Sequence, residues 1–309
     1  MKIPPFAALA VAVGAFGSVP VFVRYFAWHL DVWTVNGVRY GLVAVAAAIY
    51  IAVEHRRRGV APALWRCALV PAAVNVCGQI LWGLSPYFNT APVNAFAVRS
   101  AFFFTVVWSV LLLPDERPIV RRPLFWLATL VTVVGMWLLF YHTIQEPGSM
   151  TVRGAVVILS CAVFFGGYGV VVRHYMPQFP VLLSFAVVCV YTAAVLLVLM
   201  LCCGDFRVLG GFGGGMWGLI AASSLLGIAI AHLALYRALH ALGTVPCAGA
   251  LNLSPVISYV LAWLFLDETF STTQWGGGCA CWWRRWRSCT CARSAPTGNR
   301  TAVFFRLSR

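Results

Sequence analysis

Apolar residues dominate the chain in nine runs, which are separated by charged residues or by clusters of proline and glycine. A run of about 20 apolar residues is long enough for a helix to cross the hydrocarbon core of a bilayer. The pattern therefore predicts an all-α polytopic membrane protein with about nine spans. We expect these spans at residues 4–23, 33–53, 67–86, 92–113, 123–142, 154–172, 180–201, 216–236 and 245–266.

The composition excludes a soluble, disordered or fibrous protein. Of the 309 residues, 61% are hydrophobic and 10% are charged, whereas a soluble domain has about 25% charged residues. The net charge of +14 is unevenly spread, because seven of the 22 basic residues follow Gly278 without any acidic residue among them. We therefore expect membrane lipid as a partner and no nucleic acid.

Basic residues in the short loops set the orientation, because the cytoplasmic side collects Lys and Arg. One side receives ten of them and the other receives Arg24, Arg153 and Arg207. The ten are Lys2, Arg56, Arg57, Arg58, Arg66, Arg117, Arg121, Arg122, Arg173 and Arg237. We expect a cytoplasmic N-terminus in the plasma membrane, which is the inner membrane of a bacterium.

The chain contains an internal repeat. Residues 91–117 align with residues 243–269, and the acidic pair Asp115-Glu116 then falls on Asp267-Glu268 at an offset of 152. The distribution of Lys and Arg puts the first acidic pair on the cytoplasmic side of the membrane and the second on the opposite side. The two halves are therefore inverted relative to each other, a plan of transporters that bind substrate at the midplane between repeats.

Several segments resemble the EamA-type permeases of the drug/metabolite transporter superfamily, in order, over about residues 5–278. They are Phe16-Gly17-Ser18-Val19-Pro20-Val21, Val38-Arg39-Tyr40, Ala241-Leu242, Leu253-Ser254-Pro255-Val256, Leu266-Asp267-Glu268-Thr269 and Gln274 with Gly276. The resemblance implies two five-helix repeats, which we expect at residues 4–142 and, incomplete, at 152–278. It also implies a permease that exports small metabolites by alternating access.

The tail at residues 279–309 departs from that pattern, because the family places a tenth helix near its start. Arg284, Arg285 and Arg287 would each cost about 2.5–3.5 kcal/mol at the centre of a span. The segment could lie on an anionic leaflet or be a solvated tail, but the interpretation we favour is a shifted reading frame. The nucleotide sequence at codons 274–282 tests this interpretation.

Enzyme signatures such as H-E-x-x-H, G-x-S-x-G and the Walker glycine pattern do not occur in the sequence. The C-x-C pairs Cys279/Cys281 and Cys289/Cys291 lack the two to four intervening residues of structural zinc sites. We therefore predict a non-enzymatic protein without a cofactor or a metal.

Two arginines lie inside predicted spans, Arg39 and Arg99. An arginine within the membrane must face a wet cavity or a partner, which marks a candidate functional site. The alternative for Arg39 is a snorkelling or orienting role near the end of its span. Since a guanidinium binds carboxylates in a bidentate manner, the pair favours amino acids or other carboxylated metabolites as substrates.

Polar residues on three other spans complete the candidate substrate site. Asn75, Gln79 and Trp82 recur on one helical face of the third span, which is typical of a cavity wall or of hydrogen bonds between helices. Comparable positions of the repeats hold Asn94 on the fourth span and Asn252 with Ser254 on the ninth. Pro255 interrupts the helical ladder there and frees carbonyl groups.

Among the histidines of the sequence, only His232 lies well inside a predicted span. Tyr236 lies one helical turn further on and is its expected partner. The pair is a candidate for proton coupling, although a lone histidine in a bundle is more often a packing element. The alternative to transport is a non-functional, truncated product or a membrane scaffold. The sequence leaves the substrate and the oligomeric state, monomer or homodimer, open.

Overall fold

The computed structural model describes residues 4–121 and 151–266 and five positions between them, namely 123, 126, 127, 130 and 134. The described residues of the first half form α1 (Pro5–Ala27), α2 (Val32–Arg58), α3 (Pro62–Leu84), η1 (Ser85–Tyr87), α4 (Ala91–Ala97), η2 (Val98–Ser100), α5 (Ala101–Leu112), η3 (Pro114–Glu116) and α6 (Arg117–Val120). Those of the second half form α8 (Val152–Tyr175), α9 (Val181–Cys203), η4 (Phe206–Gly211), α10 (Gly214–Ser224), the π-helix η5 (Leu225–Ile230), α11 (Ala231–Leu242), α12 (Thr244–Leu251) and α13 (Ser254–Leu266).

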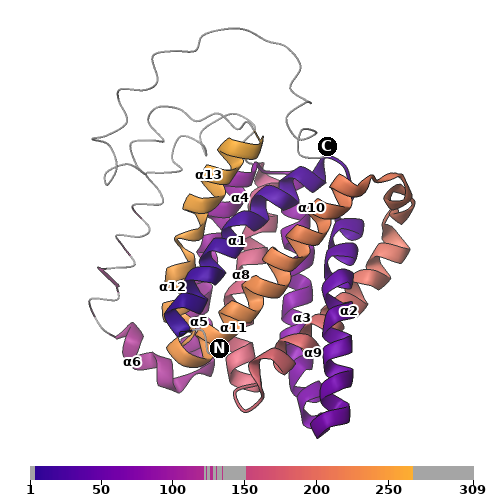
Figure 1. The fold of residues 1–309 in the computed structure, drawn as a ribbon. Coiled ribbons are helices and arrows are strands. Elements are labelled where there is room, and N and C mark those ends of the chain that lie inside the picture. The colour runs from indigo at the N-terminus through magenta and orange to yellow at the C-terminus, as the bar shows by residue number, and fades with distance from the viewer. Residues whose placement is uncertain are drawn as a thin grey trace.

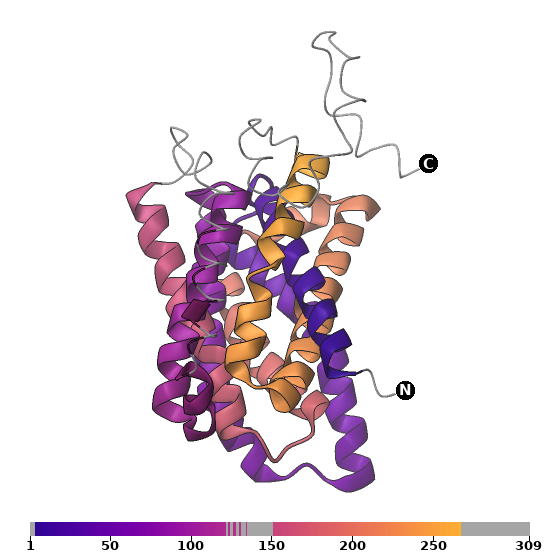
Figure 2. The same ribbon diagram turned by 90° about the vertical axis from the view of Figure 1, so that its left-hand side faces the viewer.

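The described residues contain eight helices long and apolar enough to cross a membrane. They correspond to eight of the nine predicted spans and stand side by side in one bundle (Figures 1 and 2). No strand occurs in the described part of the chain. The predicted all-α membrane fold is therefore confirmed. The span expected at 123–142 lies mostly outside the described residues, as does the tail at 279–309.

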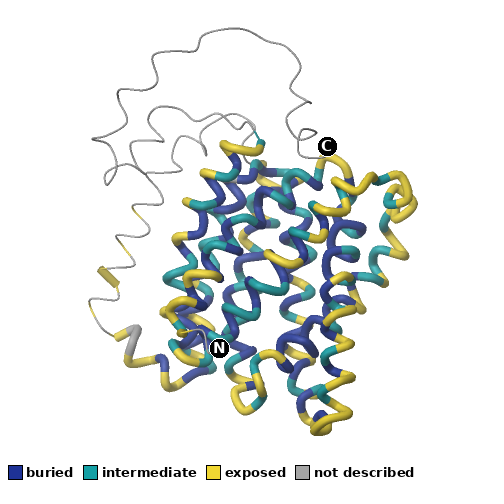
Figure 3. The backbone as a smooth tube through the Cα atoms, in the orientation of Figure 1, coloured by how far each residue is buried: buried dark blue, intermediate teal, exposed yellow. Residues whose placement is uncertain are grey.

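Apolar side chains cover the outside of the bundle as well as its interior. Ile49 on α2 and Leu111 on α5 are each 61% exposed, and exposed positions follow the outward faces of the helices (Figure 3). Such a surface is costly in water and suits contact with lipid chains. Buried polar side chains such as Asn75 and Thr105 lie in the interior, where they form hydrogen bonds to neighbouring helices.

The two halves run in opposite directions. Arg24 in the last turn of α1 donates a hydrogen bond to the carbonyl of Pro86, just after α3. At the same end of the bundle, Asn89 donates to the carbonyl of Gly154, in the first turn of α8 (3.2 Å). Because α8 begins where α1 ends, these equivalent helices are antiparallel, as the charge distribution predicts.

Helix packing repeats between the halves. α2 packs along its counterpart α9, and the contact of α3 with α8 has its counterpart in that of α11 with α1. Likewise α5 packs on α8 as α13 packs on α1, and α4 contacts α13 as α12 contacts α5. Exchanging the halves thus maps these principal contacts onto one another, which is the property of a two-fold inverted repeat.

Glycines permit the closest of these crossings. A Cβ atom on Gly166 of α8 would lie 2.6 Å from the carbonyl oxygen of Ala101 on α5. A Cβ atom on Gly17 of α1 would lie 2.7 Å from Ile257 and 3.0 Å from the Ser254 carbonyl on α13. The hydroxyl of Ser258 donates to the Gly17 carbonyl across the same crossing. Small residues at both places let the backbones approach, as in many membrane helix pairs.

Asp31 caps the start of α2 and joins this helix to the loop that follows α9. Its carboxylate accepts hydrogen bonds from the amides of Trp33 and Thr34, both at 2.9 Å, and of Asp205 at 3.1 Å. Partial burial acts to raise the pKa of Asp31, but these hydrogen bonds outweigh it and lower the pKa below its ordinary value. The charged carboxylate is therefore the form that this cap stabilises.

Gly166→Ala should destabilise the protein by roughly 1–3 kcal/mol, because the added methyl group meets backbone atoms that cannot move aside. Gly14→Ala is the matched control, since nothing lies within 4 Å of a Cβ atom at Gly14. Thermal unfolding of both purified variants in detergent measures the difference. Equal unfolding temperatures would contradict the importance of the α5–α8 crossing.

Candidate functional site

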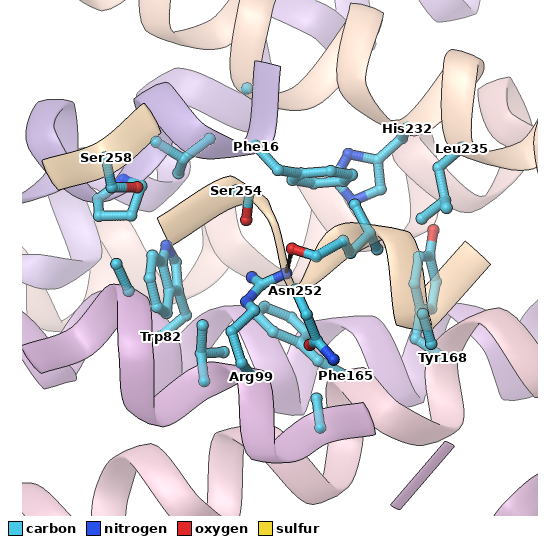
Figure 4. Close-up of a pocket in the computed structure, with 18 of the residues that line it drawn as sticks. Phe16, Trp82, Arg99, Phe165, Tyr168, His232, Leu235, Asn252, Ser254 and Ser258 are labelled. Carbon is cyan, nitrogen blue, oxygen red and sulfur yellow. Dashed lines mark hydrogen bonds between the residues drawn. The ribbon is translucent and has the colours of Figure 1, made fainter. Parts of the chain in front are cut away.

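A cavity lies inside the bundle and is lined from both halves of the chain (Figure 4). It encloses about 940 Å³ of empty space, including the part that is open to solvent. The walls come from α1, α2, α3, the broken span α4–η2–α5, α8, the segment η5–α11 and the break between α12 and α13. Seven of the predicted site residues line it, namely Arg39, Gln79, Trp82, Arg99, His232, Asn252 and Ser254.

Arg39 is placed in the wall by α2 and is 2% exposed. Its Nη2 atom lies 3.5 Å from the carbonyl oxygen of Ser223, and its buried Nε atom has no hydrogen-bond partner. Gly227 makes room for this guanidinium, because a Cβ atom there would lie 3.1 Å from Nη2. The charge is thus held at the cavity with most of its donors still available.

The segment that faces Arg39 is the π-helix η5, which includes Gly227 and Ile228 of the cavity wall. A π-helical turn inside an α-helix is less favourable than regular helix and is found frequently at functional sites. In this protein it separates α10 from α11 within one span. Its position beside Arg39 and just before His232 supports this cavity as the candidate functional site.

Arg99 lies on η2, where the fourth span is broken, and its Nη1 atom donates to the carbonyl of Leu251 at 3.0 Å. Leu251 is the last residue of α12, and Pro255 lies in the first turn of α13. The carbonyl is therefore free of the helical ladder, as predicted from the proline. Residues 99 and 251 are also 152 positions apart, which is the offset of the repeat.

Carboxylates are absent from the described part of the cavity wall. The described acidic residues are Asp31, Glu54, Asp115, Glu116 and Asp205. Glu116 is buried, but it accepts hydrogen bonds from Arg173, from the hydroxyl and amide of Thr244, and from the amide of Val245. Within the described structure, the two cavity arginines therefore face the cavity without an acidic counter-ion.

Asn75 does not line the cavity, although it shares a helical face with Gln79 and Trp82. Its amide nitrogen lies 3.1 Å from the hydroxyl of Thr192 on α9, and its oxygen accepts from Gln79 at 3.4 Å. The alternative interpretation of this face, hydrogen bonding between helices, therefore holds for Asn75. Gln79 and Trp82, one and two turns further on, do reach the cavity.

Asn94 also lies outside the cavity wall and has a structural environment. Its side-chain oxygen accepts hydrogen bonds from the hydroxyl of Ser85 and from the amide of Asn89 (3.0 Å). Asn89 in turn donates to Gly154. Asn94 thus joins the end of α3 to the start of α8, while Asn252, which follows α12 and corresponds to Ser100 at the repeat offset, lines the cavity.

Tyr236 pairs with Tyr168 and not, as expected, with His232. The two tyrosine hydroxyls are 2.6 Å apart, whereas Nδ1 of His232 lies 3.0 Å from the carbonyl oxygen of Ile228. The His232 ring packs against Phe16 and Tyr168 at centroid distances of 5.2 and 5.8 Å. His232 lines the cavity and Tyr236 does not, and their role in proton coupling stays a prediction.

Aromatic residues form a large part of the wall, and sequence reasoning missed most of them. Phe16, Phe102, Phe165 and Tyr168 line the cavity beside Trp82. Trp82 and Phe165 lie 6.3 Å apart between ring centroids, and Figure 4 shows the Arg99 side chain in their vicinity. Phenylalanine in an apolar run gives no sequence signal that separates a cavity wall from a lipid-facing surface.

Comparison with known families connects this architecture to transport. Residues 152–282 match the model of the EamA-like transporter family. Most of the second half of the chain is therefore similar to this family. Together with the eight apolar helices of the described residues, this match supports a multi-pass membrane permease of the drug/metabolite transporter type.

The fold also occurs among solved structures. A structure described only as a crystal structure of a protein is 18% identical, covers 89% of this chain and 93% of its own, and has a TM-score of 0.63. This likeness shows the fold and carries no information on substrate. No curated protein sequence matches the chain.

Asn94→Ala should lower the stability of the protein by about 1–3 kcal/mol, because it removes the acceptor of the buried Ser85 hydroxyl and one of the two acceptors of Asn89. Asn252→Ala is the comparison variant, since the Asn252 side chain faces the cavity. Thermal unfolding should separate the two variants. A larger loss of stability for Asn252→Ala would contradict this division between structural and cavity residues.

Proposed function

We propose that the protein exports small carboxylated metabolites across the membrane by alternating access. The observation that carries the proposal is the pair Arg39 and Arg99, two guanidinium groups that line one cavity between the halves without an acidic partner among the described residues. A buried charge is costly in a membrane unless a partner or water compensates it. An anionic substrate supplies that compensation, and guanidinium groups favour carboxylates.

Alternating access is supported by the arrangement of the halves, which we assign to repeats at residues 4–142 and 152–278. Both halves line the cavity, and the principal helix contacts of one half have counterparts in the other. Rocking of one repeat against the other exchanges equivalent contacts and exposes the cavity to alternate sides. In this proposal the N-terminus is cytoplasmic and the bundle lies in a bacterial inner membrane.

A cluster at one end of the bundle, which we call the acidic latch, fits the role of a gate. The latch consists of Glu116, Arg173 and the first turn of α12 at Thr244 and Val245. Asp115 adds an outer ion pair to Arg173 at 2.7 Å. The charge rule puts this end on the cytoplasmic side. We propose that the latch closes the cytoplasmic entrance and opens when the repeats rock.

Arg99→Ala should reduce carboxylate transport at least tenfold, because a hydrogen bond to a charged group contributes about 1.5–3 kcal/mol. The assay is uptake of radiolabelled carboxylates into proteoliposomes that contain the full chain, with a panel of amino, hydroxy and dicarboxylic acids. Arg153→Ala, which removes an exposed arginine at the start of α8, is the control for loss of charge.

Equal transport by the Arg99→Ala and Arg153→Ala variants would contradict a role of Arg99 in substrate binding. If the unsubstituted protein moves none of the panel above the level of empty liposomes, the carboxylate proposal fails. That result would favour the alternative of a scaffold or a non-functional product.

Glu116→Gln should loosen the acidic latch, because the neutral amide loses the charge that holds Arg173 and the first amides of α12. Asp115→Asn is the matched control, since the Asp115 side chain is 58% exposed and contributes the outer ion pair. Hydrogen–deuterium exchange should become faster at Thr244 and Val245 in the Glu116→Gln variant alone. Equal exchange in both variants would contradict the latch.

A further inference from the structure

We infer that the cavity selects net anions with an apolar or aromatic body, and that it discriminates against zwitterions such as amino acids. This inference rests on the proposed function and narrows its substrate class. It follows from the charges, the hydrogen-bond donors and the aromatic walls of the described cavity.

The charge balance of the cavity favours an anion over a zwitterion. Arg39 and Arg99 line it, and each described carboxylate is placed elsewhere: Asp31 caps α2, Glu54 pairs with Arg58, Asp115 and Glu116 pair with Arg173, and Asp205 lies in an exposed loop. A substrate ammonium group would therefore add a third positive charge without a carboxylate to receive it. His232 does not change the sign, because protonation would add a further positive charge.

Backbone carbonyls exposed at a helix break are the usual partners of cations in transporters of this kind. In this cavity the carbonyl of Leu251 at the break is already occupied by Arg99 at 3.0 Å. The carbonyl of Ser223 similarly faces Nη2 of Arg39 at 3.5 Å. The two carbonyl groups that could accept hydrogen bonds from a substrate ammonium group are thus already occupied by Arg39 and Arg99.

Donors for an anion remain available at the same place. Each of the two arginines has five N–H groups, and the structure gives each a single carbonyl partner. The Nε atoms of both are buried without a hydrogen-bond partner. A carboxylate that enters the cavity can therefore accept hydrogen bonds from donors that the protein itself leaves unpaired. Such bonds are strongly favourable in a low-dielectric interior, where an unpaired polar group is costly.

The remaining wall defines the body of the substrate. Phe16, Trp82, Phe102 and Phe165 present aromatic surface, and rings in such surroundings pack in tilted or edge-to-face arrangements. A planar apolar body fits these walls while the carboxylate lies at the arginines. The chemical class is therefore an aromatic or otherwise apolar carboxylate that carries no ammonium group.

The test compares phenyllactate with phenylalanine, which share the ring, the chain length and the carboxylate but carry a hydroxyl or an ammonium group on the same carbon. Isothermal titration of the purified full chain in detergent gives both Kd values. We expect phenyllactate to bind at least tenfold more tightly. Arg99→Ala and Arg39→Ala should each weaken phenyllactate binding at least tenfold, while Arg153→Ala should leave it unchanged.

A designed carboxylate provides a second variant. Gln79 lines the cavity, and Gln79→Glu places an acidic group among the arginines, so the preference for phenyllactate over phenylalanine should shrink at least threefold. An unchanged ratio in a folded Gln79→Glu variant would overturn the inference. Folding is checked by gel filtration and thermal unfolding.

The outcomes separate this inference from the proposed function. If phenylalanine binds as tightly as phenyllactate or more tightly, with Arg99 still required, aromatic rings accommodate the ammonium group. The inference is then overturned and carboxylate export stands. If neither compound binds and no carboxylate is transported, both proposals are overturned.

Discussion

A helix can be broken inside a membrane only where the freed carbonyl groups find donors, and in this protein one donor is Arg99. Its hydrogen bond to Leu251 satisfies the end of α12 and fixes a guanidinium at the cavity wall at the same time. Because the two residues are related by the offset of the repeat, this bond joins equivalent points of the two halves. The helix break, the buried charge and the cavity therefore depend on one contact.

The close helix crossings keep that contact in place. α5 and α8 approach at Gly166, and α13 and α1 approach at Gly17, where side chains of ordinary size would meet backbone or branched atoms. At these crossings the two broken spans, α4–η2–α5 and α12–α13, pack against the unbroken helices α8 and α1. Packing of small residues, which supplies much of helix association in lipid, thus positions the breaks whose carbonyls and arginines form the site.

The spans and the arginines of the site could be predicted from the sequence, because the free energies of placing apolar residues and buried charges in a membrane are large. A run of about 20 apolar residues is most stable as a membrane-spanning helix. An arginine inside such a helix, such as Arg39 or Arg99, must reach a partner or a water-filled cavity. The partners of uncharged polar residues could not be predicted in this way. Asn75 and Asn94 bond to neighbouring helices, and Tyr236 pairs with Tyr168, because crossing geometry decides such contacts. The aromatic wall and the π-helix gave no sequence signal.

The first half of the chain holds α12 at both ends. At its start, the carboxylate of Glu116 accepts hydrogen bonds from the amides of Thr244 and Val245. At its end, the guanidinium of Arg99 donates to the carbonyl of Leu251. Both charges have the sign that the helix dipole favours, negative at the amino end and positive at the carboxyl end. Since one end of α12 belongs to the latch and the other to the cavity wall, this short helix is a rigid connection between the two. Because two charged residues of the first half hold opposite ends of this two-turn helix, α12 cannot leave its position without losing the latch, the contact at the cavity wall, or both.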